Sequence, residues 1–120
     1  MRQGSNTLLI MEVTVPNKVD DETRGLYRMI SGLLVCSRAP AVVNAIEEAS
    51  AEVGRSRYSQ EAESHRQALA DAVRLNLIDR HEYPYELLVR RYGLCESPAQ
   101  FREERLQFCR RVAQMCGLCS

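Results

Sequence analysis

Apolar residues recur every three or four positions along most of the chain, the spacing that places them on one face of an α-helix. The first stripe follows the acidic pair Asp20 and Asp21, which can cap a helix, and ends near Arg38. The second begins at Pro40, a residue favoured in the first turn of a helix, and ends before Gly54, a natural carboxyl-terminal cap. The stripes are Leu26, Met29, Ile30, Leu33 and Leu34, and Val42, Val43, Ile46, Ala49 and Val53. Two helices are therefore predicted before residue 54.

Three further helices are predicted in the rest of the chain. Ser59 offers an N-cap to the third, whose stripe is Ala62, Leu69, Val73 and Leu77. The fourth is short and runs from Pro84 to Gly93, where a left-handed turn can end it. The fifth starts with a capping box at residues 97–100 (SPAQ) and runs to about Cys116. Its apolar stripe is Phe101, Phe108, Val112 and Met115.

The amino-terminal segment has a different pattern. Residues 7–15 (TLLIMEVTV) are apolar and β-branched, and Pro16-Asn17 ends the run, as in a short strand or an extended arm. Because no later segment supplies a strand partner, an arm docked on the helices is the favoured interpretation. The predicted fold is a mostly α single domain of about five helices, with an arm at 1–17, a helical core at 18–83 and a helix-turn-helix-like unit at 84–120.

Composition narrows the class of protein. A chain of 120 residues with 45% apolar content suits one core, and 16 basic residues balance 16 acidic ones. This balance argues against a general polyanion binder but leaves room for a local basic patch. No stretch approaches the roughly 18 apolar residues of a membrane span, so a cytoplasmic protein that makes no membrane contact is expected.

The cysteines and histidines give little sign of chemistry. Five cysteines form no disulfide framework, and reduced thiols are the simplest interpretation. The spacing of Cys116 and Cys119, with Cys109 nearby, leaves a zinc or redox site as a minor alternative to small core side chains. His65 and His81 lack catalytic partners at a motif spacing, and adjacent carboxylates such as Glu103 and Glu104 read as surface charges. We therefore expect no catalysis and no cofactor.

The last two predicted helices have the layout of a helix-turn-helix, in which the second helix offers side chains to base edges. Outward-facing positions near the start of the fifth helix are expected to be Gln100, Arg102, Glu103 and Arg105. Gln and Arg have the donor geometry for adenine and guanine, and further arginines could contact phosphates: Arg90, Arg91, Arg110 and Arg111. Residues 84–120 hold six arginines against four glutamates, a surplus of two.

The stretch from Tyr85 to Leu118 (YELLVRRYGLCESPAQFREERLQFCRRVAQMCGL) resembles the carboxyl-terminal helix-turn-helix of small phage and prophage regulators of the RinA and ArpU kind. The shared pattern is an apolar helix ending RYGL, then Ser, Phe, arginines, an FC pair and a tail ending GL. The RYGL ending is also similar to the fourth region of primary sigma factors. The resemblance implies a phage-encoded transcription regulator whose last long helix enters the major groove of DNA.

Two functions from different classes follow. The favoured hypothesis is a phage or prophage DNA-binding transcription regulator, for which a homodimer would match a two-fold operator. The alternative is a small phage-encoded protein that binds and inhibits a host enzyme or a defence complex, in the manner of anti-CRISPR proteins. A balanced surface without catalytic groups suits this alternative equally well.

Overall fold

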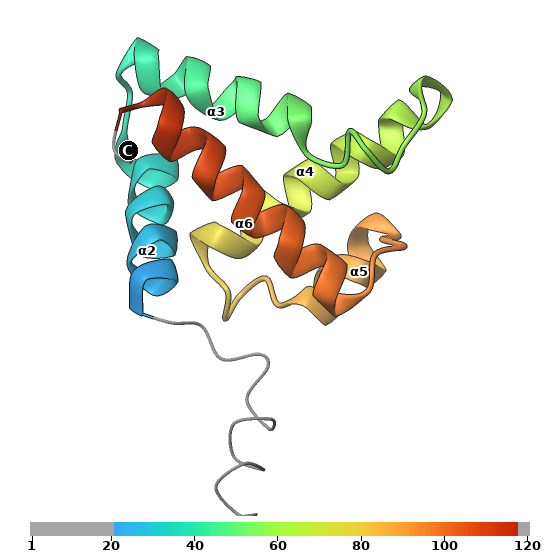
Figure 1. Cartoon of the computed structure of the whole chain (residues 1–120). Helices are drawn as coiled ribbons and strands as arrows, with labels where there is room; N and C mark the ends of the chain where they lie inside the picture. The colour runs from blue at the N-terminus through green and yellow to red at the C-terminus, as the bar shows by residue number, and fades with distance from the viewer. Residues whose placement is uncertain (1–20, 118–120) are drawn as a thin grey trace, which may run out of the picture.

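Five α-helices and one short 3-10 turn make up the part of the chain that the computed structural model describes, residues 21–117 (Figure 1). In chain order they are α2 (Asp21–Cys36), α3 (Pro40–Glu52), η1 (Gln60–Ala62), α4 (Glu63–Ile78), α5 (Tyr85–Tyr92) and α6 (Pro98–Met115). The predicted mostly α class is confirmed, and residues 21–117 contain no strand. The predicted arm at 1–17 lies outside the described residues.

Local signals set most of the helix boundaries, as predicted. Gly54 and Gly93 follow α3 and α5 with φ of +73° and +66°, a left-handed conformation that favours glycine. The capping box of α6 is complete: the Ser97 hydroxyl accepts from the Gln100 amide at 3.1 Å, and Gln100 Oε1 accepts from the Ser97 amide at 2.9 Å. The chain's own turn and cap residues therefore position α5 and α6.

The start of the third predicted helix differs from the prediction. Ser59 precedes the 3-10 turn η1, its side chain makes no capping hydrogen bond, and α4 begins only at Glu63. The amide of Ala62 bonds to the Ser59 carbonyl at 3.0 Å, which is the tighter spacing of a 3-10 turn. Backbone hydrogen bonds of a 3-10 turn, rather than a side-chain cap, therefore lead into α4.

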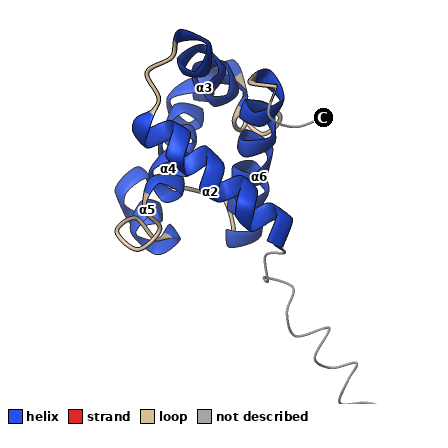
Figure 2. Cartoon of the chain, turned by 90° about the vertical axis from the view of Figure 1, so that its left-hand side faces the viewer, coloured by secondary structure: helices blue, strands red, loops and turns tan. Residues whose placement is uncertain are grey.

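Helix α6 is the central element of the bundle. It crosses between α2 and α3 and packs on α4 as well, whereas α5 packs mainly on α4 (Figures 1 and 2). Phe101, Phe108 and Val112 of α6 are fully or almost fully buried. They meet a core contributed by the other helices: Ile30, Ile46, Ala49, Val53, Leu69, Val73, Leu77 and Leu88. Three helices therefore cover one face of α6, and the other face is open to solvent.

Some members of the predicted stripes lie at the edge of the core. Met29 is 36% exposed, Val43 37% and Met115 45%. Met29 and Val43 adjoin better buried residues, Ile30 and Val42, so the 100° turn per residue places them at the side of the packed face, and Met115 is the last residue of α6. The buried face of each helix therefore lies on the predicted side, but it is narrower than the apolar stripe in the sequence.

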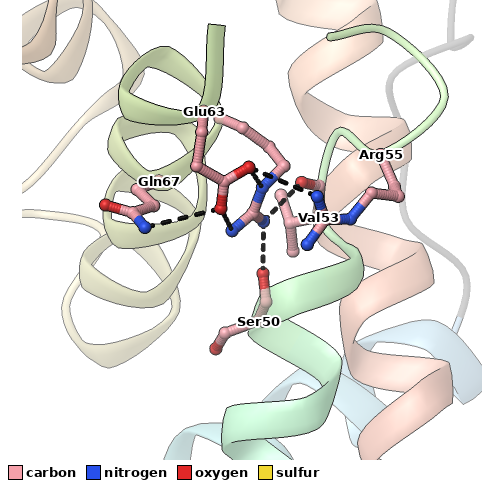
Figure 3. A network of polar contacts seen from close by, with 6 residues as sticks. Ser50, Val53, Arg55, Glu63 and Gln67 are labelled. Carbon is pink, nitrogen blue, oxygen red and sulfur yellow. Dashed lines mark hydrogen bonds and ion pairs between the residues drawn. The ribbon is translucent and has the colours of Figure 1, made fainter. Parts of the chain in front are cut away.

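A buried arginine, Arg66, joins α3 to α4, and Figure 3 shows its partners Ser50, Val53 and Glu63. Arg66 is 4% exposed, and its Nη1 donates to the carbonyls of Ser50 at 2.9 Å and Val53 at 3.0 Å. Its Nε and Nη2 donate to the two carboxylate oxygens of Glu63 at 3.0 and 2.8 Å. This single guanidinium donates to two carbonyls at the end of α3, of which the Ser50 carbonyl also accepts from the Val53 amide at 3.2 Å.

The contact with Arg66 gives Glu63 an acid-sensitive role. Its hydrogen bonds to that guanidinium lower the pKa of the Glu63 carboxyl from its usual 4.5 to about 2. A lowered pKa in the folded state means that the pairing stabilises the fold above pH 4.5 and is lost as pH falls towards 2. Denaturant titrations across this window should show that Glu63→Gln loses less stability on acidification than the parent protein.

A matched neutralisation checks that result. Glu61 is exposed, so Glu61→Gln removes the same charge without removing the Arg66 pairing. Equal acid sensitivity of the two variants would show that the pairing does not govern stability at low pH.

No individual helix between residues 21 and 117 has the length and apolar content needed to cross a membrane. The helices α2 and α3 meet those criteria only when taken together, with a bend of 115° between them.

Candidate anion-binding cleft

The two helices predicted to form a helix-turn-helix are present in chain order as α5 and α6, and one face of α6 is covered by other helices. Of the predicted DNA-contacting residues, Gln100 and Arg110 are exposed on α6 and Arg102 is half-buried. Arg90 and Arg91 are exposed on α5, and the Arg91 guanidinium lies 5.6 Å from the centre of the Tyr92 ring. The exposed face of α6, which includes Gln100, Glu103 and Arg110, is the part of this helix that could approach a base edge.

Arg105 does not face outward, contrary to the sequence-based prediction. It is 7% exposed, and its Nη1 donates to Asn76 Oδ1 at 2.6 Å. Its guanidinium carbon lies 4.7 Å from the centre of the Tyr27 ring, within reach of a cation–π contact. Four residues separate Arg105 from the buried Phe101, so both project from the face of α6 that the other helices cover.

Glu104 is also buried, so its assignment as a surface charge is wrong. It is 6% exposed, and its Oε1 accepts from the Gly54 amide at 3.0 Å. Its Oε2 accepts from Arg57 Nε at 2.7 Å. Through these hydrogen bonds the carboxylate links the α3–α4 connection to the middle of α6, which is a structural role.

Arg105 and Asn76 line a hollow between α2, the end of α4 and α6. The hollow has a volume of about 330 Å³, and α2 forms one wall with Arg24, Tyr27, Arg28 and Ser31. The other lining residues are Asn76 and Leu77 near the end of α4, Arg80 in the turn that follows it, and Arg105 of α6. Four of the eight lining residues are arginines, and none of the eight is acidic.

A second hollow of about 300 Å³ adjoins the first and shares Asn76, Arg80 and Arg105 with it. Its further lining residues are Pro84, Tyr85, Glu86, Phe101 and Arg102. We call the two hollows together the arginine cleft. Five arginines and one glutamate line it, so the cleft concentrates positive charge on a chain whose formal net charge is zero.

The arginines of the cleft differ in their pairing. Arg24 pairs with the exposed Asp21 at 3.4 Å. Within residues 21–117, no carboxylate lies within 4.0 Å of the guanidinium of Arg28, Arg80 or Arg105. Asn76 holds Arg105 in place, because its Nδ2 donates to the Tyr83 carbonyl at 2.9 Å while its Oδ1 accepts from Arg105. The cleft therefore offers an anion one guanidinium that is held in place, Arg105, and the exposed guanidinium groups of Arg28 and Arg80.

Another hollow, between the α3–α4 connection and α6, has a different charge pattern. Its volume is about 400 Å³, and its charged lining consists of three glutamates and three arginines: Glu52, Arg55, Arg57, Glu103, Glu104 and Arg111. Arg57 pairs with Glu104 at 2.7 Å, and Arg55 pairs with Glu63 at 3.2 Å. Because its charges largely neutralise one another, this hollow is a poorer receptor for an anion than the arginine cleft.

The cysteines that the structure describes are separate thiols. Cys109 is fully buried, and desolvation raises the pKa of its thiol to about 12, which disfavours the thiolate that binds metal or attacks a disulfide. Cys116 is half-buried, and Cys119 lies outside the described residues. Between residues 21 and 117, no three His, Cys, Asp or Glu side chains come together as metal ligands would.

Sequence reasoning missed most of the cleft. Arg24, Arg28 and Arg80 were not among the predicted site residues, although the spacing of Arg24 and Arg28 places them on one helix face. What the sequence could not give is the packing of α2 against α6, which brings residues about 80 positions apart to the same hollow.

No protein family model, no curated protein and no solved structure matches the chain.

Proposed function

We propose that this protein binds nucleic acid and that the arginine cleft contacts its phosphates. The observation that carries the proposal is the gathering of five arginines from α2, the end of α4 and α6 around adjoining hollows. Arginine binds phosphate oxygens through paired N–H groups, and phosphate contacts supply most of the affinity of such complexes. The proposal keeps the DNA-binding regulator of the sequence analysis and changes which residues make the contacts.

Base reading, where it occurs, is assigned to the accessible start of α6. Gln100 is exposed in the first turn, and Arg102 lies at the edge of the cleft one turn before Arg105. Phosphate contacts by Arg28 and Arg80 would set the position of the duplex, and Gln100 and Arg102 would then face base edges. Arg105 is held inside the cleft by its contacts with Asn76 and Tyr27, so it is not assigned to base edges.

A salt series tests the role of the cleft. Binding of labelled duplex DNA, followed by fluorescence anisotropy, should weaken at least about tenfold in the double variant Arg28→Gln, Arg80→Gln at low salt. Each lost phosphate contact should also reduce the slope of log K against log salt by about 1. Both side chains are at the surface of the fold, so the variant should remain helical.

The control is Arg38→Gln, Arg110→Gln, which removes the same charge from two exposed arginines outside both hollows of the cleft. An equal loss in this control would move the contact surface away from the cleft. If the parent protein binds no DNA even at low salt, the proposal fails and the protein-binding inhibitor becomes the better hypothesis. The exposed Val35 and Met115 would then be the first side chains to mutate.

A further inference from the structure

Arg105 is a buried cation whose counter-charge is absent from the described part of the chain. Its side chain is almost fully enclosed, its Nη1 meets the neutral Asn76 amide, and its Nε has no hydrogen-bond partner. The remaining contact is the face of the Tyr27 ring. A buried charge without a paired anion is costly, and an arginine held this way is usually completed by one.

The groups around Arg105 define what that anion must be. Arg28 and Arg80 line the same hollow, and Ser31 adds a hydroxyl donor. Three guanidinium groups suit a ligand with two negative charges and several acceptor oxygens better than a single carboxylate. A phosphate monoester carries about −1.5 to −2 charges near pH 7 on three such oxygens.

The burial of Arg105 favours binding of a phosphate monoester over the phosphodiesters within a strand. Arg105 is only 7% exposed, so a group that reaches it must be narrow at its tip. A phosphate within a continuous strand has a sugar on each side, whereas a terminal phosphate has one substituent and carries an additional charge. The hollow of about 330 Å³ is near the lower limit for small-ligand sites, so it also suits a free phosphorylated molecule.

We propose that the hollow between α2, α4 and α6 is a receptor for a phosphate monoester, held by Arg28, Arg80 and Arg105. If the proposed function is correct, the phosphate belongs to a nucleic-acid strand with a 5′-terminal phosphate. Only this identity of the ligand rests on the proposed function. A small phosphorylated molecule would present the same chemistry. The experiment below distinguishes these two sources.

The test compares two 3′-labelled single-stranded oligonucleotides of one sequence, one with a 5′-phosphate and the other with a 5′-hydroxyl, at fixed salt. The 5′-phosphorylated strand should bind at least about tenfold more tightly to the parent protein. The preference should disappear in Arg28→Gln and in Arg80→Gln and persist in Arg38→Gln. Arg105→Lys, which keeps the charge but loses the planar fork, should reduce the preference if the variant folds.

Inorganic phosphate is the second probe, added as a competitor and in thermal melts. Because phosphate also stabilises proteins by exclusion from their surface, the melt of Arg28→Gln defines the background. Stabilisation of the parent protein beyond that background, without a preference between the two strands, supports the receptor and assigns it to a small ligand. Absence of both effects overturns the receptor, even when salt-dependent duplex binding remains and the proposed function stands.

Discussion

Arg66→Met should lower the free energy of unfolding by about 2–4 kcal/mol, because two carbonyls at the end of α3 lose their charged donor. Methionine is an unbranched apolar side chain of comparable length, so the substitution fills much of the volume while removing the hydrogen bonds. The Val53 carbonyl bond lies in the buried part of the structure, where water cannot easily replace the donor. Urea denaturation followed by far-UV circular dichroism measures the loss.

Arg55→Met provides the comparison, since Arg55 contacts the same carboxylate from the surface. Its Nη1 lies 3.2 Å from Glu63 Oε1, its side chain is 46% exposed, and it donates to no buried carbonyl. The loss for this variant should stay below about 1 kcal/mol, as for other exposed ion pairs. Similar losses for Arg55→Met and Arg66→Met would mean that the ion pairs to Glu63, and not the carbonyl contacts, account for the effect.

Helix boundaries could be predicted because the chain encodes them within a few residues. Gly93 adopts the left-handed conformation that ends α5, and the side chains of Ser97 and Gln100 complete the cap of α6. These signals act through local backbone geometry and do not depend on which helices later pack together. The start of α4 could not be predicted from Ser59, because a 3-10 turn made by backbone bonds replaced the expected side-chain cap.

Whether a charged side chain is buried or exposed could not be predicted in the same way. Arg66, Glu104 and Arg105 are all at least nine-tenths buried, although charged residues on a helix read as solvent-facing from sequence. Each has a partner on another element: Arg66 at the end of α3, Glu104 at Gly54, and Arg105 at Asn76. Such pairings depend on the helix packing, which residue spacing within one segment does not encode.

The same reasoning explains why the candidate site moved. The predicted site lay within residues 90–110, since a helix-turn-helix is a local motif that a single sequence can suggest. In the structure α6 is central, and its covered face takes Arg105 away from the outer surface. Arg28 and Arg80 then join Arg105 from other elements, so the site is defined by three segments and not by one motif.

Gly54→Ala should destabilise the fold by about 2–4 kcal/mol, because this position requires glycine for two separate reasons. Its φ of +73° places a new side chain in the left-handed region, which costs about 1–2 kcal/mol. A Cβ there would also lie 3.1 Å from Leu69 Cδ2 and 3.3 Å from Arg66 Cγ. Crowding of this kind in a packed region costs about 1–3 kcal/mol, and the reduced freedom of the unfolded chain returns about 0.4–1 kcal/mol.

Gly93→Ala isolates the two contributions to the Gly54 effect. Gly93 has a similar φ of +66°, but a Cβ at this position would meet no atom within 4 Å. Its loss should therefore be about 1 kcal/mol, the left-handed cost less the unfolded-state gain. The difference between the variants in urea denaturation measures how tightly α4 packs on the turn that Glu104 holds through the Gly54 amide. Equal losses would show that Leu69 and Arg66 move aside freely, and that the turn is not tightly packed against α4.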